Sequence, residues 1–300
     1  MLQNSTLFKF MIATSKLGQN QQTIRNDISF SGIGLHTGQD SKVIIKSSNI
    51  NSGVNFFRGD LEGDNKIKGL WRNVTSTTLS TTISNSSKAS ISTIEHLMSA
   101  LSGMHIDNVD IYVYGPEIPI MDGSSKPFVE LIKKSGIVSQ GESRKVIKII
   151  KEVKVSKDDS FVKIFPNNEF SVDFEIEFDS YLINKQAKQL QLINGNYVSD
   201  ISSARTFGFE KDVKQLRENG LALGGSLDNA VVVGEKSILN KEGLRFKDEF
   251  VRHKILDSIG DLYLAGLPVQ GYFVGKKSGH YLNVQLLRKL FSDNSNFEVI

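Results

Sequence analysis

The chain has 300 residues, of which 39% are hydrophobic and 23% charged, a composition typical of a globular protein and not of a disordered one. Its 36 basic and 33 acidic residues leave a net charge of +3, which gives no case for nucleic acid as the main partner. It contains no cysteine, which excludes a disulfide framework, a thiolate metal site and a cysteine nucleophile.

Residues 1–20 are expected to form a disordered N-terminal extension. They hold a short apolar patch at residues 7–12, but Lys9 interrupts it and no small-residue cleavage site follows. No apolar run in the sequence approaches the length of a membrane span. We therefore predict a cytoplasmic protein without stable membrane insertion.

The first half of the chain combines strands with two helices. Alternating apolar residues or turn signals predict strands at 27–30, 42–45, 75–92 and 107–114. Helices are predicted at 93–102 and at 127–134, the second of which Gly136 closes.

After a polar stretch at residues 140–144, a second series of elements begins. Strands are predicted at 146–155, 161–165, 170–178, 230–233, 237–239 and 270–274. Helices are predicted at 212–218, from about 251 to 266, and at 279–290. Because both halves mix strands and helices, we predict an α+β fold of two similar domains of layered sheets and helices, domain I at 21–144 and domain II at 145–300.

The helix expected to end at residue 266 carries a polar stripe. His253, Asp257 and Asp261 follow one another at intervals of four residues, opposite an apolar face. Imidazole and carboxylate suit zinc, and catalytic zinc takes three protein ligands while leaving a position for water. A solvated helix face would show the same stripe, and the spacing does not decide between the two.

A third ligand has to come from another segment, and His96 is the candidate because the chain has only five histidines. The alternative is structural, since Ser92 and Glu95 have the spacing of a capping box, in which Glu95 would cap its own helix. His280, at a predicted helix start, is either a general acid or a capping or surface histidine. We interpret His105 as structural.

Several segments together resemble the zinc-dependent UDP-3-O-acyl-N-acetylglucosamine deacetylases of Gram-negative lipid A synthesis. They are LHTG at 35–38, STIEHL at 92–97, PEIPIMDGS at 116–124, SARTFGF at 203–209, LGGS at 223–226, and HKILD at 253–257 continuing through Gly260 and Asp261 to Ser278-Gly279-His280. Their order and spacing run from about residue 23 to the end of the chain, so the match as a whole is far more specific than any one segment.

The resemblance implies an active site at the domain interface, with one Zn²⁺ per chain held by His96 and His253 together with Asp257. An Fe²⁺ ion would suit the same donors. Zinc would polarise the acetamide carbonyl and lower the pKa of its bound water, whose proton Glu95 would take as general base. His280 would then protonate the departing amine.

Further roles follow from the same resemblance. Asp261 would orient His280, and Thr206 would stabilise the tetrahedral oxyanion together with the metal. The residues expected to bind substrate are Phe178, Lys254, Phe207 and Gly225. Phe178 would stack on uracil, although Phe170 and Phe174 alternate on the same face, and residues 207–223 would cradle the acyl chain. The alternative for Lys254 is a solvated lysine, and the alternative for residues 207–223 is a segment of the ordinary core.

The expected reaction is hydrolysis of the N-acetyl group of UDP-3-O-acyl-N-acetylglucosamine, giving UDP-3-O-acyl-glucosamine and acetate, by a protein predicted to be a monomer. The partner that we predict for the protein is this small-molecule substrate. One rival hypothesis is a phosphoesterase, but that chemistry favours two metals with bridging carboxylates. The other is a binding protein without activity, which would need neither Glu95 nor His280.

Overall fold

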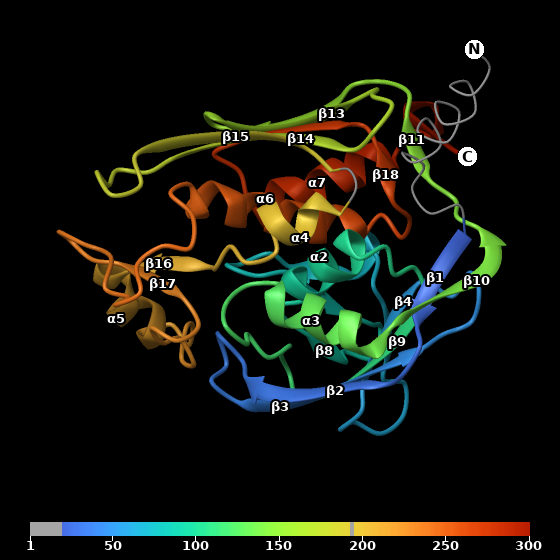
Figure 1. Cartoon of the computed structure of the whole chain (residues 1–300), viewed down its shortest axis with the longest axis horizontal. Helices are drawn as coiled ribbons and strands as arrows, with labels where there is room; N and C mark the ends of the chain where they lie inside the picture. Colours follow the sequence, from blue (N-terminus) through green and yellow to red (C-terminus); the bar gives the residue numbers. More distant parts are fainter. Residues whose placement is uncertain (1–19, 193–194) are drawn as a thin grey trace, which may run out of the picture.

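The computed structural model describes residues 20–192 and 195–300, and these fold into two halves of matching architecture (Figure 1). The extension expected at the N-terminus lies, except for Asn20, outside the described residues. Within the described residues, no helix combines the length and apolar character that crossing a membrane requires.

The first half is built on a five-stranded sheet in the order β2-β3-β9-β4-β5. Its strands are β2 Ile28–Ile33, β3 Asp40–Ser47, β4 Val54–Arg58, β5 Lys66–Lys68 and β9 Val109–Tyr114. Alternate residues such as Val43 and Ile45 in β3 are buried, which gives the sheet one apolar face. The helices α2 Glu95–Gly103 and α3 Lys126–Ser135 complete this half.

The second half has its own five-stranded sheet, in the order β12-β13-β19-β14-β15. Its strands are β12 Val153–Lys157, β13 Ser160–Phe165, β14 Ser171–Glu177, β15 Lys185–Gln191 and β19 Tyr272–Lys276. The helices α6 Glu249–Tyr263 and α7 His280–Leu290 pack against it.

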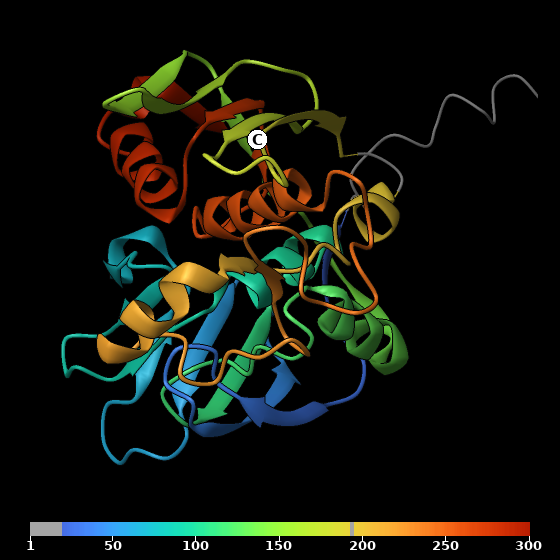
Figure 2. The same ribbon diagram turned by 90° about the vertical axis from the view of Figure 1, so that its left-hand side faces the viewer.

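The two sheets share one topology. In each, the first, second, fifth, third and fourth strands along the chain lie side by side, and only the pairing of the fifth with the third is parallel. Figures 1 and 2 show the sheets on the outside of the molecule, with the helices between them. The α2 and α6 helices therefore meet at the centre, and the predicted α+β fold of two similar halves is confirmed.

Smaller elements surround this frame. They are the pair β1 Asn20–Ile24 and β10 Ile137–Ser143; a sheet of β6 Val74–Ser76, β7 Thr82–Ser84 and β8 Ser90–Ile91; a sheet of β11 Ile147–Ile149, β18 Val269–Gln270 and β20 Phe297–Val299; the pair β16 Phe207–Phe209 and β17 Val231–Val233; the helices α4 Asn196–Asp200 and α5 Glu210–Glu218; and the 3₁₀ turns η1 Trp71–Asn73 and η2 Asn294–Asn296.

Two expectations about elements were wrong, and one strand of the second five-stranded sheet was missed. The single strand predicted at 146–155 is two strands, β11 and β12, which belong to different sheets. Residues 237–239 form only an isolated bridge between Val233 and Ile238. The edge strand β15 was missed because its sequence KQAKQLQ buries no residue and so shows no apolar alternation.

Candidate active site with a metal-binding group

His96, His253 and Asp257 come together in one buried group. Asp257 Oδ1 lies 3.3 Å from His253 Nε2 and 3.6 Å from His96 Nε2, and one ligand atom from each residue lies within 4.8 Å of the others. All three residues are 4% exposed or less, so a solvated helix face is excluded. Asp257 Oδ1 is buried and accepts no hydrogen bond from any of the described residues, as expected of an atom that is free to bind a metal.

The electrostatics of this group suit a cation. Burial lowers the pKa of His253 to about 4, which keeps its imidazole neutral at pH 7. Burial acts against the Asp257 carboxylate, but His253 and Lys254 outweigh it and hold the pKa of Asp257 well below its usual value. Neutral imidazole and ionised carboxylate are the forms that bind metals.

Gly260 sets how closely α2 and α6 approach each other. A Cβ atom at this position would lie 2.1 Å from the Glu95 carbonyl oxygen and 3.1 Å from the Ser99 nitrogen. No real side chain fits there, so only glycine lets the helix that carries His253 touch the helix that carries His96. The candidate metal-binding group of His96, His253 and Asp257 depends on this contact because its members come from both helices.

Glu95 does not cap its helix, so the capping-box alternative is wrong. Residue Thr93 adopts a left-handed φ of 57° and donates its hydroxyl to Glu117 over 2.7 Å, and the residue at the cap, Ile94, makes no side-chain hydrogen bond. The helix therefore starts at Glu95 itself. Its carboxylate accepts the Thr81 N–H over 3.0 Å, and burial raises its pKa.

His280 lies opposite Glu95, with Nε2 3.7 Å from Glu95 Oε1. Its Nδ1 lies 2.8 Å from Asp261 Oδ2, and Asp261 also accepts hydrogen bonds from Thr81 Oγ1 over 2.6 Å and Asn283 Nδ2 over 2.9 Å. Burial disfavours the imidazolium, but Asp261 and Glu95 outweigh it and raise the pKa of His280 to about 9. The residue is therefore protonated at neutral pH, and since α7 has no side-chain cap it is not a capping histidine.

Thr81 and Asn283 were missed at the sequence level. Asn283 stands three residues after His280 on the same helix, a spacing that could have indicated it. Thr81 carries no local signal, because it reaches the site from the loop between β6 and β7.

A third missed residue, Glu249, is linked to His253 through one peptide group. The Ala204 carbonyl lies 3.1 Å from His253 Nδ1, and the N–H of the same peptide, on Arg205, donates to Glu249 Oε1 over 3.0 Å. Arg205 Nε adds a 2.9 Å bond to the same oxygen, and Glu249 is fully buried. This arrangement fixes the carbonyl that orients His253, as outer partners of metal-binding histidines commonly do.

The residues expected at the substrate are placed as follows. Lys254 Nζ lies 3.1 Å from Asp257 Oδ2 with a side chain only 17% exposed, so it is not a solvated lysine. Thr206 stands two residues after Ala204 and donates its N–H to Gly123; its hydroxyl makes no hydrogen bond within residues 20–192 and 195–300.

Phe178 belongs to an aromatic cluster that leads to the metal-binding group. Its ring centroid lies 5.6 Å from that of Phe207, which in turn is 6.3 Å from the His253 ring. Phe174, by contrast, is fully buried in the core, and Phe170 is half-buried against it. Of the three alternating phenylalanines, Phe178 is thus the one in contact with Phe207.

Residues 207–223 form β16, α5 and the turn beyond, which project from the body of the molecule (Figure 1). No residue of α5 is buried, so the ordinary-core alternative is wrong for this helix. The segment docks on the loop of the first half, where Leu223 N–H donates to the His36 carbonyl and Gly224 N–H to the Leu35 carbonyl. Gly225 is half-buried in the same turn.

His36, in the LHTG segment, also borders this region. Glu117, fully buried, holds the loop by accepting the backbone N–H groups of His36 and Thr37 over 3.0 and 2.8 Å. His36 Nε2 is buried and has no hydrogen-bond partner in the described part of the chain, and burial lowers the pKa of His36. By comparison His105 lies apart from the site, where burial and Arg144 lower its pKa to about 4, in line with a structural residue.

Comparison with known proteins gives a consistent result. The family model LpxC, UDP-3-O-acyl N-acetylglycosamine deacetylase, matches residues 21–292. Curated proteins named UDP-3-O-acyl-N-acetylglucosamine deacetylase are similar along most of their length. The protein of Syntrophus aciditrophicus is 48% identical over 92% of this chain and 88% of its own, that of Psychrobacter cryohalolentis 46% over 95% and 89%, and that of Pseudomonas entomophila 44% over 93% and 93%.

Proposed function

This chain belongs to the UDP-3-O-acyl-N-acetylglucosamine deacetylase family, and on that premise we propose that His96, His253 and Asp257 hold a Zn²⁺ ion in its active site. The protein is a hydrolase that removes the N-acetyl group of UDP-3-O-acyl-N-acetylglucosamine, a reaction of lipid A biosynthesis that yields UDP-3-O-acyl-glucosamine and acetate. The observation that carries the metal assignment is the buried Asp257 Oδ1, which faces two imidazole nitrogens and has no hydrogen bond within residues 20–192 and 195–300.

The donor set supports zinc. Two imidazole nitrogens and one carboxylate are a common ligand set of catalytic zinc sites, although Fe²⁺ accepts the same donors. When bound, the ion polarises the acetamide carbonyl and lowers the pKa of water. One such ion per chain suits the geometry, since the described residues contain a single cluster of three His or acidic side chains with ligand spacing.

Glu95 acts as the general base. Its carboxylate stands next to the ligand His96 and is held by the Thr81 N–H, so its position is fixed before substrate binds. Burial raises its pKa, which brings its basicity closer to that needed at neutral pH. It takes a proton from the water molecule that attacks the acetyl carbon.

His280 acts as the general acid. The pKa of about 9 keeps it protonated at pH 7, and the bond from Nδ1 to Asp261 leaves Nε2 to face the reaction. Because His280 Nε2 also faces Glu95, the general base and the general acid lie close enough to act on the same substrate group. The Nε2 proton passes to the departing amine nitrogen, so the sugar leaves as an amine and acetate is released.

The remaining roles concern the substrate. The Thr206 hydroxyl donates to the developing oxyanion, and the Lys254 ammonium binds the polar part of the sugar nucleotide. Phe178 stacks on uracil, while Phe207 and Gly225 with the projecting segment 207–223 take up the acyl chain.

We also assign residues 21–144 to domain I and 145–300 to domain II, which places the active site between the domains. The repeated sheet topology and the position of β10 at the end of the first half support this boundary. We propose a monomer that acts in the cytoplasm on a small-molecule substrate, without nucleic acid or stable membrane insertion as partners.

The decisive experiment measures acetate released from UDP-3-O-acyl-N-acetylglucosamine by the purified protein. We expect the protein to release acetate when it holds about one equivalent of zinc. Chelation should remove both the zinc and the activity, and the activity should return when zinc is restored. His253→Ala should lack both the metal and the activity. Metal retained in full by that variant would remove His253 as a ligand, and absence of acetate from the zinc-loaded wild type would overturn the proposed substrate. Hydrolysis of a phosphomonoester in its place would favour the phosphoesterase.

A further inference from the structure

Glu117 is a fully buried carboxylate that ties two segments of the first half together. Its Oε1 accepts the His36 N–H over 3.0 Å and the Thr93 hydroxyl over 2.7 Å. Its Oε2 accepts both the N–H and the hydroxyl of Thr37 over 2.8 Å. Hydrogen bonds to an ionised acceptor are shorter and stronger than those between neutral groups, so this carboxylate fixes its donors firmly.

The bond to Glu117 accompanies an unfavourable backbone conformation of Thr93. The φ of Thr93 is 57°, in the left-handed region that a β-branched residue rarely adopts. Such a conformation persists only where surrounding contacts impose it. Thr93 is buried, and next to it Ser92 donates its N–H to the Pro116 carbonyl and accepts the Ile118 N–H. The segment that carries Glu117 therefore stabilises the left-handed turn at Thr93.

The turn at Thr93 directs the start of α2 onto Thr81. The Ile94 N–H donates to the Thr81 carbonyl over 3.3 Å, and the Thr81 N–H donates in return to Glu95 Oε2 over 3.0 Å. Thr81 Oγ1 also donates to Asp261 over 2.6 Å. Because one residue receives the end of the turn and also holds the Glu95 carboxylate, a change of φ at Thr93 would displace that carboxylate.

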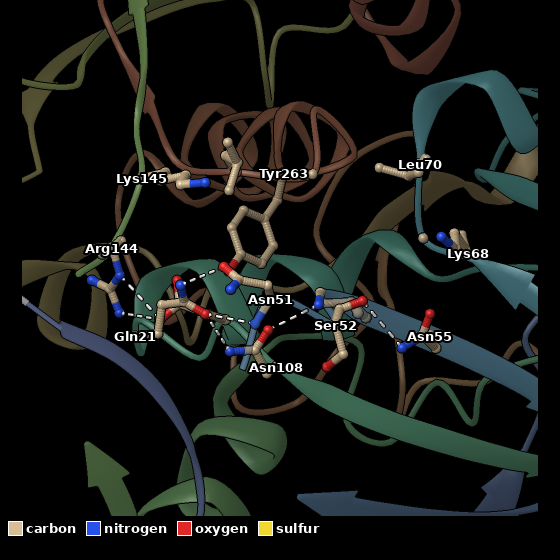
Figure 3. Close-up of a pocket in the computed structure, with 16 residues that line it drawn as sticks. Gln21, Asn51, Ser52, Asn55, Lys68, Leu70, Asn108, Arg144, Lys145 and Tyr263 are labelled. Atoms are coloured by element: carbon tan, nitrogen blue, oxygen red, sulfur yellow. Dashed lines mark hydrogen bonds and ion pairs between the residues drawn. The ribbon is translucent and has the colours of Figure 1, made fainter. Parts of the chain in front are cut away.

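The opposite end of α2 is held by separate contacts. Beyond the helix, the Tyr263 hydroxyl donates to the Ile106 carbonyl over 2.7 Å, and Arg144 pairs with Asp107 over 2.7 Å. Tyr263 and Arg144 line a cavity of about 310 Å³ at this end (Figure 3). Since these contacts do not involve the turn at Thr93, loss of the turn would affect the first residues of α2 more than the rest of the helix.

On the premise of the function proposed above, we propose that Glu117 is a positioning residue for the deacetylation. It holds Thr93 in the left-handed turn and by this means places the general base Glu95. The same carboxylate holds residues 36–37, and the His36 carbonyl accepts the Leu223 N–H from the segment assigned to the acyl chain. Removal of Glu117 therefore affects substrate binding as well, so the role of the turn is measured in kcat and that of the loop in KM.

Two substitutions of Thr93 test the turn without changing Glu117. Thr93→Ala and Thr93→Gly both remove the hydroxyl, but only glycine adopts a φ near 57° freely. We expect Thr93→Ala to lower kcat for acetate release by about 10- to 100-fold, since a misplacement of about 1 Å can cost about 10²-fold. Thr93→Gly should stay within about threefold of the wild type, because its backbone keeps the turn without strain. Equal kcat values for the two variants would overturn the proposal.

A second pair of variants tests whether Glu117 acts through the turn. Glu117→Ala should lower kcat as strongly as Thr93→Ala does. In the Thr93→Gly background the same substitution should change kcat by less than about threefold, because glycine does not need the carboxylate to hold its conformation. KM should rise in both backgrounds, since residues 36–37 lose their acceptor in each. An equal loss of kcat in both backgrounds would refute the route through Thr93. If Glu117→Ala does not fold, the two variants of Thr93 still decide.

Lys88 provides the matched control, because it also has a left-handed φ, of 65°, but is exposed in the turn between β7 and β8. Lys88→Ala and Lys88→Gly should both keep the wild-type kcat. All variants are loaded with zinc to the wild-type content and shown by urea unfolding to be folded under the assay conditions. Absence of acetate from the zinc-loaded wild type would overturn the proposed function, whereas a wild-type kcat in Thr93→Ala would overturn only the positioning role.

Discussion

Replacing Gly260 by alanine has two opposing effects on the stability of the protein, one from helix propensity and one from tertiary packing. Helix propensity alone predicts that Gly260→Ala stabilises α6 by about 1 kcal/mol, because alanine loses less backbone entropy on folding. The tertiary contact predicts the reverse. The new Cβ would lie 2.1 Å from the Glu95 carbonyl oxygen, and ordinary contact begins at 3.4 Å, so one of the two backbones has to move.

The size of the destabilisation depends on which atoms the new Cβ would meet. The obstacle is a carbonyl of the α2 backbone and not a flexible side chain, so the strain cannot be relieved locally. Overpacking of this kind costs about 1–3 kcal/mol, which equals or exceeds the propensity gain. The required shift also displaces Glu95 and His96 relative to His253, and a misplacement of about 1 Å can cost about 10²-fold in rate.

The assays are urea unfolding of the variant and its kcat/KM for acetate release. We expect a net destabilisation of up to about 2 kcal/mol together with a fall in kcat/KM of about 10²-fold. Gly208→Ala is the control for stability, because nothing lies within 4 Å of a Cβ at that position. A Gly260→Ala protein more stable than the wild type and equally active would refute the close approach of α2 and α6.

Four further outcomes can be checked. Glu95→Gln should keep the metal but lose about 10²–10⁴-fold in kcat; an unimpaired rate would return Glu95 to a structural role. In the wild type, kcat/KM should fall as the pH rises through the pKa of His280 near 9, since the acid must be protonated. Asp261→Asn removes the carboxylate that favours the imidazolium, so this basic limb should move to lower pH, and an unmoved limb would contradict the pairing. Glu249→Gln should weaken zinc binding about 10–100-fold in a chelator competition and alter the absorption spectrum of a Co²⁺-substituted protein. An unchanged affinity and spectrum would show that the link through the Ala204 carbonyl does not act on His253.

Much of the chemistry could be predicted from the sequence because it is local. The interval of four residues places His253, Asp257 and Asp261 on one face of α6 whatever the rest of the chain does. Glu95 and His96 are adjacent in sequence, so the start of a single helix positions both side chains. The scarcity of histidines made His96 the candidate for a third ligand, and the resemblance of the segments favoured the same residue.

Other features depend on contacts between distant segments, and no local pattern reports them. Thr81 reaches Asp261 across 180 residues of sequence, and the capping-box spacing at Glu95 misleads because Glu117 draws Thr93 into a left-handed turn. The edge strand β15 forms by backbone pairing with β14, since its side chains show no apolar alternation.

By itself the sequence determined which side chains can do chemistry and on which helices they lie, because helical periodicity and residue type are properties of a short segment. The tertiary structure alone decided that these helices touch. Gly260 permits the contact; burial then keeps His253 neutral, while the nearby carboxylates of Asp261 and Glu95 keep His280 charged against the effect of burial. The physical reason is that desolvation and charge pairing depend on what surrounds a group in space and not on its neighbours in the chain.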